Sequence, residues 1–226
     1  PRHADLGRGG VEVARRRQRR TGRRHPFRIL VAVTFATRRR HRWVLCSLVA
    51  LCACSVLVAS ADSFDPSRSR FGFEMRTRWG YMLEGLFPRY EGEVRTLPDG
   101  RHQVHLRMFT QHVEIVGHPR YTEWTRGSKF FDAERYPVVV FTSKPYDKEL
   151  LRSGGALAGD LSIRGITRPR TLEVAPSTCA RPAVDCDVVA SGAVRRSDYD
   201  MDDWQMALSD RVVFVLRARL KPAAAP

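Results

Sequence analysis

The stretch G-S-K-F-F-D-A-E-R-Y-P-V-V-V-F-T-S, from Gly127 to Ser143, decides the fold of this chain. Phe130 and Phe131 stand next to each other in a polar segment, and Pro137 then leads into an apolar, β-branched run. Proline is tolerated at the first residue of a strand, because the hydrogen-bonded ladder has not yet begun there. The stretch therefore predicts a loop with an aromatic pair and then a strand. The two rings either anchor the core, or one of them faces an internal ligand space.

On both sides of this stretch, short segments alternate apolar and polar residues with the period of a β-strand. Residues 82–96 follow the pattern less cleanly, with an interruption at Pro88, and residues 119–126 are expected to form a short helix. The remaining strands are expected at residues 71–76, 102–109, 138–143, 156–164, 167–174, 187–195 and 212–220. About eight short strands with one helical interruption predict an all-β sandwich or barrel. An eight-stranded barrel is just wide enough to be filled by side chains or to hold one small ligand.

The positive charge of the chain is concentrated near its beginning. The formal net charge is +15, but residues 1–61 hold 14 of the 39 basic residues and two of the 24 acidic ones. Residues 62–226 therefore carry 25 basic and 22 acidic side chains, which is close to neutral. This distribution argues against nucleic acid as a partner of the folded part.

A secretory signal peptide is predicted at residues 38–61. Arginines at residues 38–42 precede an uncharged apolar run at residues 43–58, and Ala59-Ser60-Ala61 is a small-residue cleavage signal. The folded domain is then residues 62–226, exported to the periplasm or secreted. An uncleaved anchor is the alternative, and a lipid anchor at Cys54 is disfavoured by the apolar residues after it. Residues 1–37 are either a basic, disordered arm or a segment upstream of the true start, since the first methionine is Met75.

Two cysteines, Cys179 and Cys186, remain beyond the leader. An even pair in an exported chain predicts a disulfide, and loop-closure entropy for this eight-residue loop is about 2.5 kcal/mol. A metal site is the alternative, but two thiols without a nearby histidine do not make a zinc set.

The sequence contains no convincing catalytic or metal-binding constellation. Four histidines, His102, His105, His112 and His118, are scattered without a carboxylate at a ligand spacing. The acidic segment 197–206 lacks the further glutamate that a calcium loop requires. No nucleophile elbow, zinc-protease helix or phosphate-binding loop is present. We therefore expect neither an enzyme, nor a metal site, nor a cofactor.

Several motifs together resemble the YceI-like family of exported proteins. The most specific are F-F-D-A-E-R-Y-P-V-V-V-F at Phe130–Phe141 and G-D-L-S-I-R-G-I-T-R-P at Gly159–Pro169, and the likeness covers residues 69–220. The resemblance implies a lipocalin-like antiparallel barrel whose lumen takes a long polyisoprenoid chain. It thus implies a binding protein without established catalysis. The chain departs from the family pattern in two places: it is compressed between Glu93 and the aromatic pair, and it carries the Cys179–Cys186 insertion. The resemblance therefore does not give the head group or the length of the ligand.

The apolar strand positions supply the expected lumen residues, although each one alone is as well explained by an ordinary core. They are Phe71, Phe73, Met75, Leu106, Met108, Phe131, Phe141, Leu161, Ile163 and Phe214. Any anionic head group is expected at the mouth of the barrel, near Arg126, Lys129, Arg164 or Arg168, although each of these alone is better explained as a solvated surface residue. Three functions follow: a carrier of a long apolar lipid, an envelope protein with a filled core that acts through its surface, and an uncharacterised enzyme. A homodimer is left open.

Overall fold

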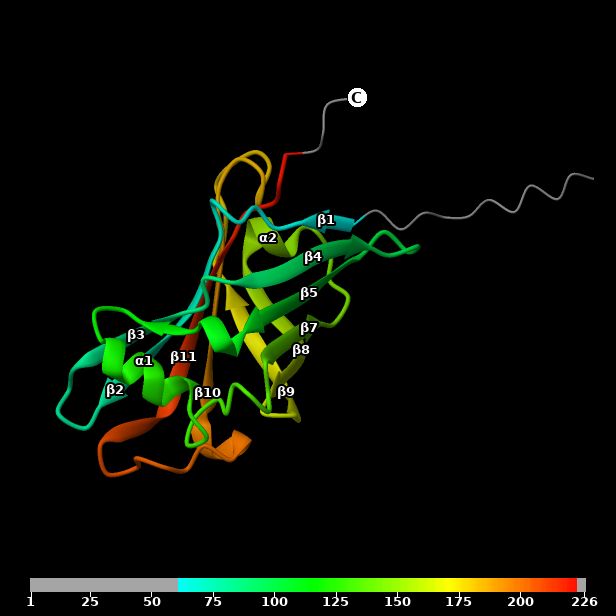
Figure 1. The fold of residues 1–226 in the computed structure, drawn as a ribbon. Helices are drawn as coiled ribbons and strands as arrows, with labels where there is room; N and C mark the ends of the chain where they lie inside the picture. Colours follow the sequence, from blue (N-terminus) through cyan, green and yellow to red (C-terminus); the bar gives the residue numbers. More distant parts are fainter. Residues whose placement is uncertain (1–60, 223–226) are drawn as a thin grey trace, which may run out of the picture. The chain divides into compact units, whose positions relative to one another are not determined.

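The computed structural model describes residues 61–222, and they form one antiparallel, curled β-sheet with two helices (Figure 1). The hydrogen-bonded order of the strands is β1-β4-β5-β7-β8-β9-β10-β11-β2-β3-β6. The strands are β1 Ala61–Ser63, β2 Arg70–Thr77, β3 Met82–Leu86, β4 Tyr90–Thr96, β5 His102–Phe109, β6 Glu114–Ile115, β7 Val138–Ser143, β8 Gly155–Ile163, β9 Ile166–Val174, β10 Val188–Arg195 and β11 Leu208–Ala218.

The all-β prediction is confirmed, but the expected strand count of eight is wrong: the sheet has eleven strands. Two of the additional strands, β1 and β6, have three and two residues. Strands this short contain no complete alternation, so their sequences carry no period to detect. Strands in which apolar and polar residues alternate strongly lie where the sequence predicts them. Strand β7, for example, begins at Val138 and ends at Ser143.

Helix α1 spans Pro119–Arg126, as the sequence predicts, and its proline lies in the first turn, where an absent N–H costs nothing. The expectation of a single helical segment is nevertheless wrong. A second helix, α2 Leu150–Ser153, lies between β7 and β8, and 3₁₀ turns cover Thr110–His112 and Arg196–Tyr199. None of the helices within residues 61–222 is long and apolar enough to span a membrane.

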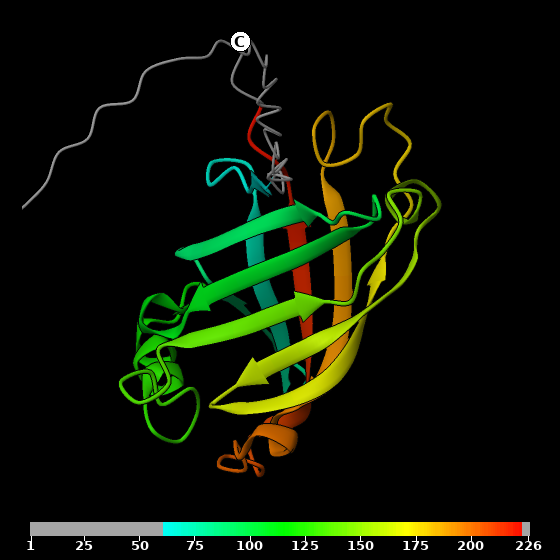
Figure 2. The same cartoon turned by 90° about the vertical axis from the view of Figure 1, so that its right-hand side faces the viewer.

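The sheet curls so that β4, β5, β7, β8 and β9 cross in front of β10, β11 and β2 (Figure 2). The tight β8–β9 hairpin fixes the register of the curl, since Ile163 pairs with Ile166 across a two-residue turn. Both turn residues, Arg164 and Gly165, have positive φ angles of 50° and 74°. This is the backbone that a right-handed twisted hairpin requires.

The edge strands β1 and β6 do not pair with each other, so hydrogen bonding along the described sheet does not return to its start. The chain just after β1 spans the gap between β4 and β11 instead. The N–H of Phe64 donates to the carbonyl of Gly92 at 3.2 Å, and Phe64 forms a bridge with Leu220. This short segment completes one end of the wall around the interior.

Candidate functional site

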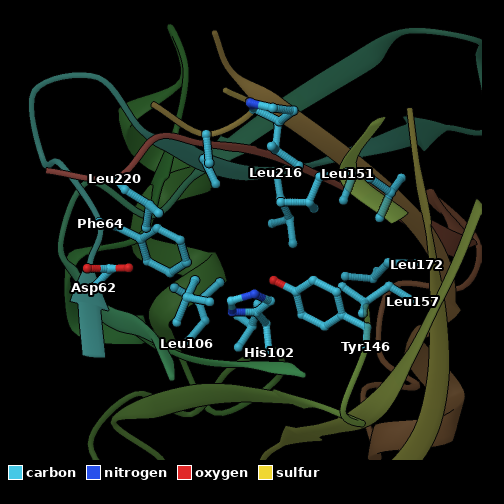
Figure 3. Close-up of a pocket in the computed structure, with 18 of the residues that line it drawn as sticks. Asp62, Phe64, His102, Leu106, Tyr146, Leu151, Leu157, Leu172, Leu216 and Leu220 are labelled. Carbon is cyan, nitrogen blue, oxygen red and sulfur yellow. The ribbon is translucent and has the colours of Figure 1, made fainter. Parts of the chain in front are cut away.

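An apolar cavity of about 210 Å³ lies inside the curl, at the end where β10 begins and β9 and β11 end (Figure 3). Its volume exceeds the 150 Å³ of a dry engineered cavity that binds benzene. The apolar residues of its wall are Phe64, Phe71, Val94, Val104, Leu106, Phe141, Leu151, Leu157, Leu172, Val174, Pro182, Ala183, Val184, Val188, Ala190, Leu216, Ala218 and Leu220. The space is therefore suited to a hydrocarbon and not to a water cluster.

Strand alternation places these side chains on the inside. On β9, Leu172 and Val174 are buried while Glu173 between them is exposed, as the period of two requires. A glycine makes room at the edge of the wall: a Cβ at Gly92 would lie 2.5 Å from the ring of Phe64. The absence of a side chain at Gly92 therefore lets the Phe64 ring approach β4 closely and line the cavity.

The loop between β9 and β10 forms one wall of the cavity. Cys179 and Cys186 are joined by a disulfide, which confirms the sequence prediction. The residues between them that line the cavity are Arg181, Pro182, Ala183 and Val184. The Ala183 carbonyl accepts a hydrogen bond of 2.7 Å from the N–H of Leu220, two residues after the end of β11. The disulfide and this hydrogen bond together hold the loop in place at the open end of the cavity, which we call its mouth.

Polar groups are few at the cavity. Asp62, Lys148 and Arg181 are charged residues among those that line it, and Tyr146 and His102 add a phenol hydroxyl and an imidazole that can form hydrogen bonds. Burial raises the pKa of the Tyr146 phenol to about 12, because the phenolate would lose its hydration. Tyr146 therefore presents a protonated hydroxyl at any physiological pH.

The other half of the interior is filled by aromatic rings. The ring of Phe131 lies 5.9 Å from that of Phe73 and 5.6 Å from that of Phe87, and Phe73 also lies 6.2 Å from Phe214. These distances are typical of favourable edge-to-face and tilted pairs. The lumen is thus divided into a hollow half and a packed half.

Phe141 lies at the boundary between these two halves. It lines the main cavity and also a second, smaller void of about 10 Å³ that includes Met108, Leu161 and Phe214. A Cβ at Gly159 would lie 2.6 Å from the Phe141 ring, so the glycine on β8 allows the ring to occupy this place. Movement of this ring would connect the two spaces.

The expected lumen residues are all buried, but they occupy three different places. Those that line the main cavity are Phe71, Leu106 and Phe141. Met108, Leu161 and Phe214 contact only the small void, and Phe73, Met75, Phe131 and Ile163 lie in the packed core. Contact with a ligand stays a prediction for each of them.

The four expected head-group residues lie away from the cavity, at the end of the curl that carries α1 and the β8–β9 turn. Arg126 donates to the carbonyl of Val113, and Arg164 donates to the carbonyls of Ser128 and Phe130. The other two also have local partners: Arg168 donates to the Asp198 carbonyl, and the Lys129 ammonium lies 3.9 Å from Asp203. The four side chains therefore stabilise the end of the sheet opposite the cavity, and none of them lines the cavity where a head group would lie.

Sequence reasoning missed the residues that shape the mouth. Leu157, Leu172 and Leu216 were detectable, because they continue the alternation of strands already predicted. Tyr146 carried no such signal, since it lies in a charged connection between β7 and α2. Only the backbone pairing of Tyr146 with His102 brings it to the cavity.

A model of the YceI-like domain matches residues 63–220. The chain belongs to the YceI-like family. The domain is similar in structure to BcnA from Burkholderia cenocepacia, with a TM-score of 0.51 and 17% identity over 69% of this chain and 98% of that one. It is also similar to a polyisoprenoid binding domain from Saccharophagus degradans implicated in plant cell wall breakdown, with a TM-score of 0.53 and 15% identity over 72% and 99% of the two chains. At these identities the likeness shows the fold alone. No curated protein matches this YceI-like sequence.

Among residues 61–222, no group of three or more histidine, cysteine, aspartate or glutamate side chains is arranged to hold a metal ion. The histidines of this YceI-like domain have neighbours of other kinds: His105 Nδ1 lies 3.0 Å from the hydroxyl of Thr142, and His118 stacks on Tyr121. The cavity can therefore bury an apolar ligand and form a few hydrogen bonds with it.

Proposed function

We propose that this YceI-like protein is an exported carrier that binds the chain of a long apolar lipid, of the polyisoprenoid class, in the cavity. The observation that carries the proposal is the apolar cavity of about 210 Å³ behind the disulfide loop. Membership of the YceI-like family and the fold shared with a polyisoprenoid binding domain support it. The disulfide supports an oxidising compartment, such as the periplasm or the exterior.

Apolar burial accounts for the affinity of such a ligand. Each buried methylene-sized group contributes about 0.8 kcal/mol, so an isoprene unit of five carbons contributes roughly 3 to 4 kcal/mol before the costs of ordering. Affinity therefore rises steeply over the first units. Further units must pass the ring of Phe141, which lies between the main cavity and the packed half.

The packed half of the interior favours a second candidate function. Phe73, Phe87 and Phe131 pack against one another there, as in a protein whose core is only structural. On that account the domain acts through its surface in the cell envelope, and the cavity is a packing defect.

Lipid extraction separates the two functions. The full chain is expressed with its leader in a bacterium, recovered from the exported fraction and analysed by native mass spectrometry. We expect a bound apolar species of several hundred daltons that denaturing extraction releases. Protein that carries no lipid, and takes up none from farnesol or geranylgeraniol micelles, would remove the carrier proposal and leave the surface function.

A further inference from the structure

Two hydrogen-bonding side chains meet in the mainly apolar cavity. His102 and Tyr146 exchange both backbone hydrogen bonds at 2.8 Å, each N–H donating to the carbonyl of the other. Residues paired in this way on antiparallel strands project their side chains to the same face. Figure 3 shows the imidazole of His102 and the hydroxyl of Tyr146 next to each other, directed into the space.

The protein itself leaves these groups unsatisfied. Within residues 61–222 the Tyr146 hydroxyl has no hydrogen-bond partner, and one nitrogen of His102, Nδ1, lies 3.3 Å from the hydroxyl of Thr96. Nε2 of His102 has no partner among the same residues. Both side chains are half-buried and line the cavity, and neither atom is among the fully buried unpaired polar atoms of residues 61–222, so a ligand in the cavity can reach them. The pair therefore provides a donor and a second polar atom that a ligand can engage.

Tyr90, another tyrosine close to the cavity end of the sheet, differs from Tyr146 in its hydrogen bonding. The hydroxyl of Tyr90 lies 3.3 Å from the carbonyls of Asp65 and Ser69, so it is satisfied by the protein. Tyr146, in contrast, belongs to the cavity lining. The same chemical group serves the fold at Tyr90 and is available to a ligand at Tyr146.

We propose that Tyr146 and His102 bind a single uncharged oxygen group, an alcohol or a carbonyl, on the apolar ligand, and that Tyr146 sets the preference for it over a bare hydrocarbon. This inference rests on the proposed lipid-binding function and adds the class of head group.

The group is uncharged because a buried anion needs a paired cation. Tyr146 and Leu106 lie with apolar neighbours inside, whereas the exposed Lys148 belongs to the rim. A phosphate would therefore stay at the rim, with Lys148 or Arg181, and leave the tyrosine unsatisfied.

The test compares three probes that share one C15 skeleton: farnesol, the hydrocarbon farnesene, and farnesyl phosphate. Their dissociation constants are measured by displacement of a fluorescent fatty probe from the oxidised, exported protein after delipidation. For the native sequence we expect farnesol to bind about tenfold more tightly than farnesene, the usual worth of one well-formed buried hydrogen bond. In Tyr146→Phe the affinity for farnesol should fall to that for farnesene, while farnesene itself binds as before.

Tyr136→Phe is the matched control. Tyr136 lies next to β7 at the opposite end, within reach of Arg135 and Arg164, and outside the cavity lining. It should retain the tenfold preference. Near-ultraviolet circular dichroism checks that both variants are folded, and His102→Gln, which keeps a polar atom, should reduce the preference less than Tyr146→Phe does.

The outcomes separate this inference from the carrier function. Equal affinity of the native protein for farnesol and farnesene would overturn the head-group assignment and leave the carrier intact. Tightest binding of farnesyl phosphate, lost in Lys148→Ala and unaffected in Tyr146→Phe, would also overturn it. Binding of none of the three probes would overturn the carrier itself.

Discussion

Replacement of Ala190 by leucine should fill part of the cavity, stabilise the empty protein and weaken lipid binding. Ala190 lies on β10 between Val188 and Gly192, and its side chain points into the cavity. Leucine adds three carbon atoms, whose burial is worth roughly 2.4 kcal/mol at about 0.8 kcal/mol each. The ordering of a leucine side chain costs about 0.5 to 1 kcal/mol. The free energy of unfolding should therefore rise by about 1.5 kcal/mol.

The same three carbons occupy space that a lipid would otherwise fill. Loss of about 2 kcal/mol of apolar contact corresponds to about a 30-fold increase in Kd. Urea denaturation of delipidated protein measures the first quantity, and probe displacement by farnesol measures the second. Opposite changes in stability and in affinity are the signature of a functional cavity.

Ala193→Leu provides the matched control, because Ala193 lies on the same strand, with an exposed side chain on the other face. It should change neither quantity beyond about 0.5 kcal/mol. Ala190→Leu with an unchanged farnesol Kd would show that the ligand lies elsewhere. A loss of stability in Ala190→Leu would show that the space is not available in solution.

Three further predictions concern the walls of the cavity. Cys179→Ser with Cys186→Ser should lower the free energy of unfolding by about 2.5 kcal/mol, and a reductant should lower that of the native sequence equally, both by urea denaturation. Because the pKa of Tyr146 is raised to about 12, its proton stays on the folded chain above pH 10 but leaves the unfolded one, and this group should lower stability by about 1.4 kcal/mol per pH unit between pH 10 and 12. Burial also raises the pKa of Tyr90 and Tyr199, so Tyr146→Phe should make the slope shallower in thermal melts without abolishing it. Gly159→Ala should cost about 1 to 3 kcal/mol in urea denaturation, since its Cβ would lie 2.6 Å from the Phe141 ring; an unchanged midpoint would mean that this ring moves freely.

Much of the fold could be predicted, because the hydrophobic periodicity and the types of residue indicate the same structure over long segments. The strand after Pro137, the helix that begins at Pro119 and the Cys179–Cys186 disulfide are all where the sequence places them. The adjacent rings of Phe130 and Phe131 illustrate the limit. Both are buried, Phe130 lies beneath the guanidinium of Arg196 and Phe131 packs against other phenylalanines, so neither lines the cavity.

The cavity could not be predicted from the sequence, for a physical reason. Inward-facing apolar residues have the same sequence pattern whether they pack against other side chains or line an empty space. The alternation along a strand indicates on which face of the sheet a side chain lies, but not what lies opposite it. Phe71 and Phe73 are successive inward residues of β2, yet the first lines the cavity and the second belongs to the packed half. The position of Tyr146 depends on long-range pairing with His102, which no local pattern encodes.

The division of the interior into a ring-filled end and a hollow end has a consequence for the proposed carrier function. A carrier spends part of its life unloaded, and then the vacant space contributes nothing to stability. The cluster of Phe73, Phe87 and Phe131 keeps its own contacts whether or not anything is bound. Delivery and refilling can therefore alternate at one end while the other end keeps the domain assembled.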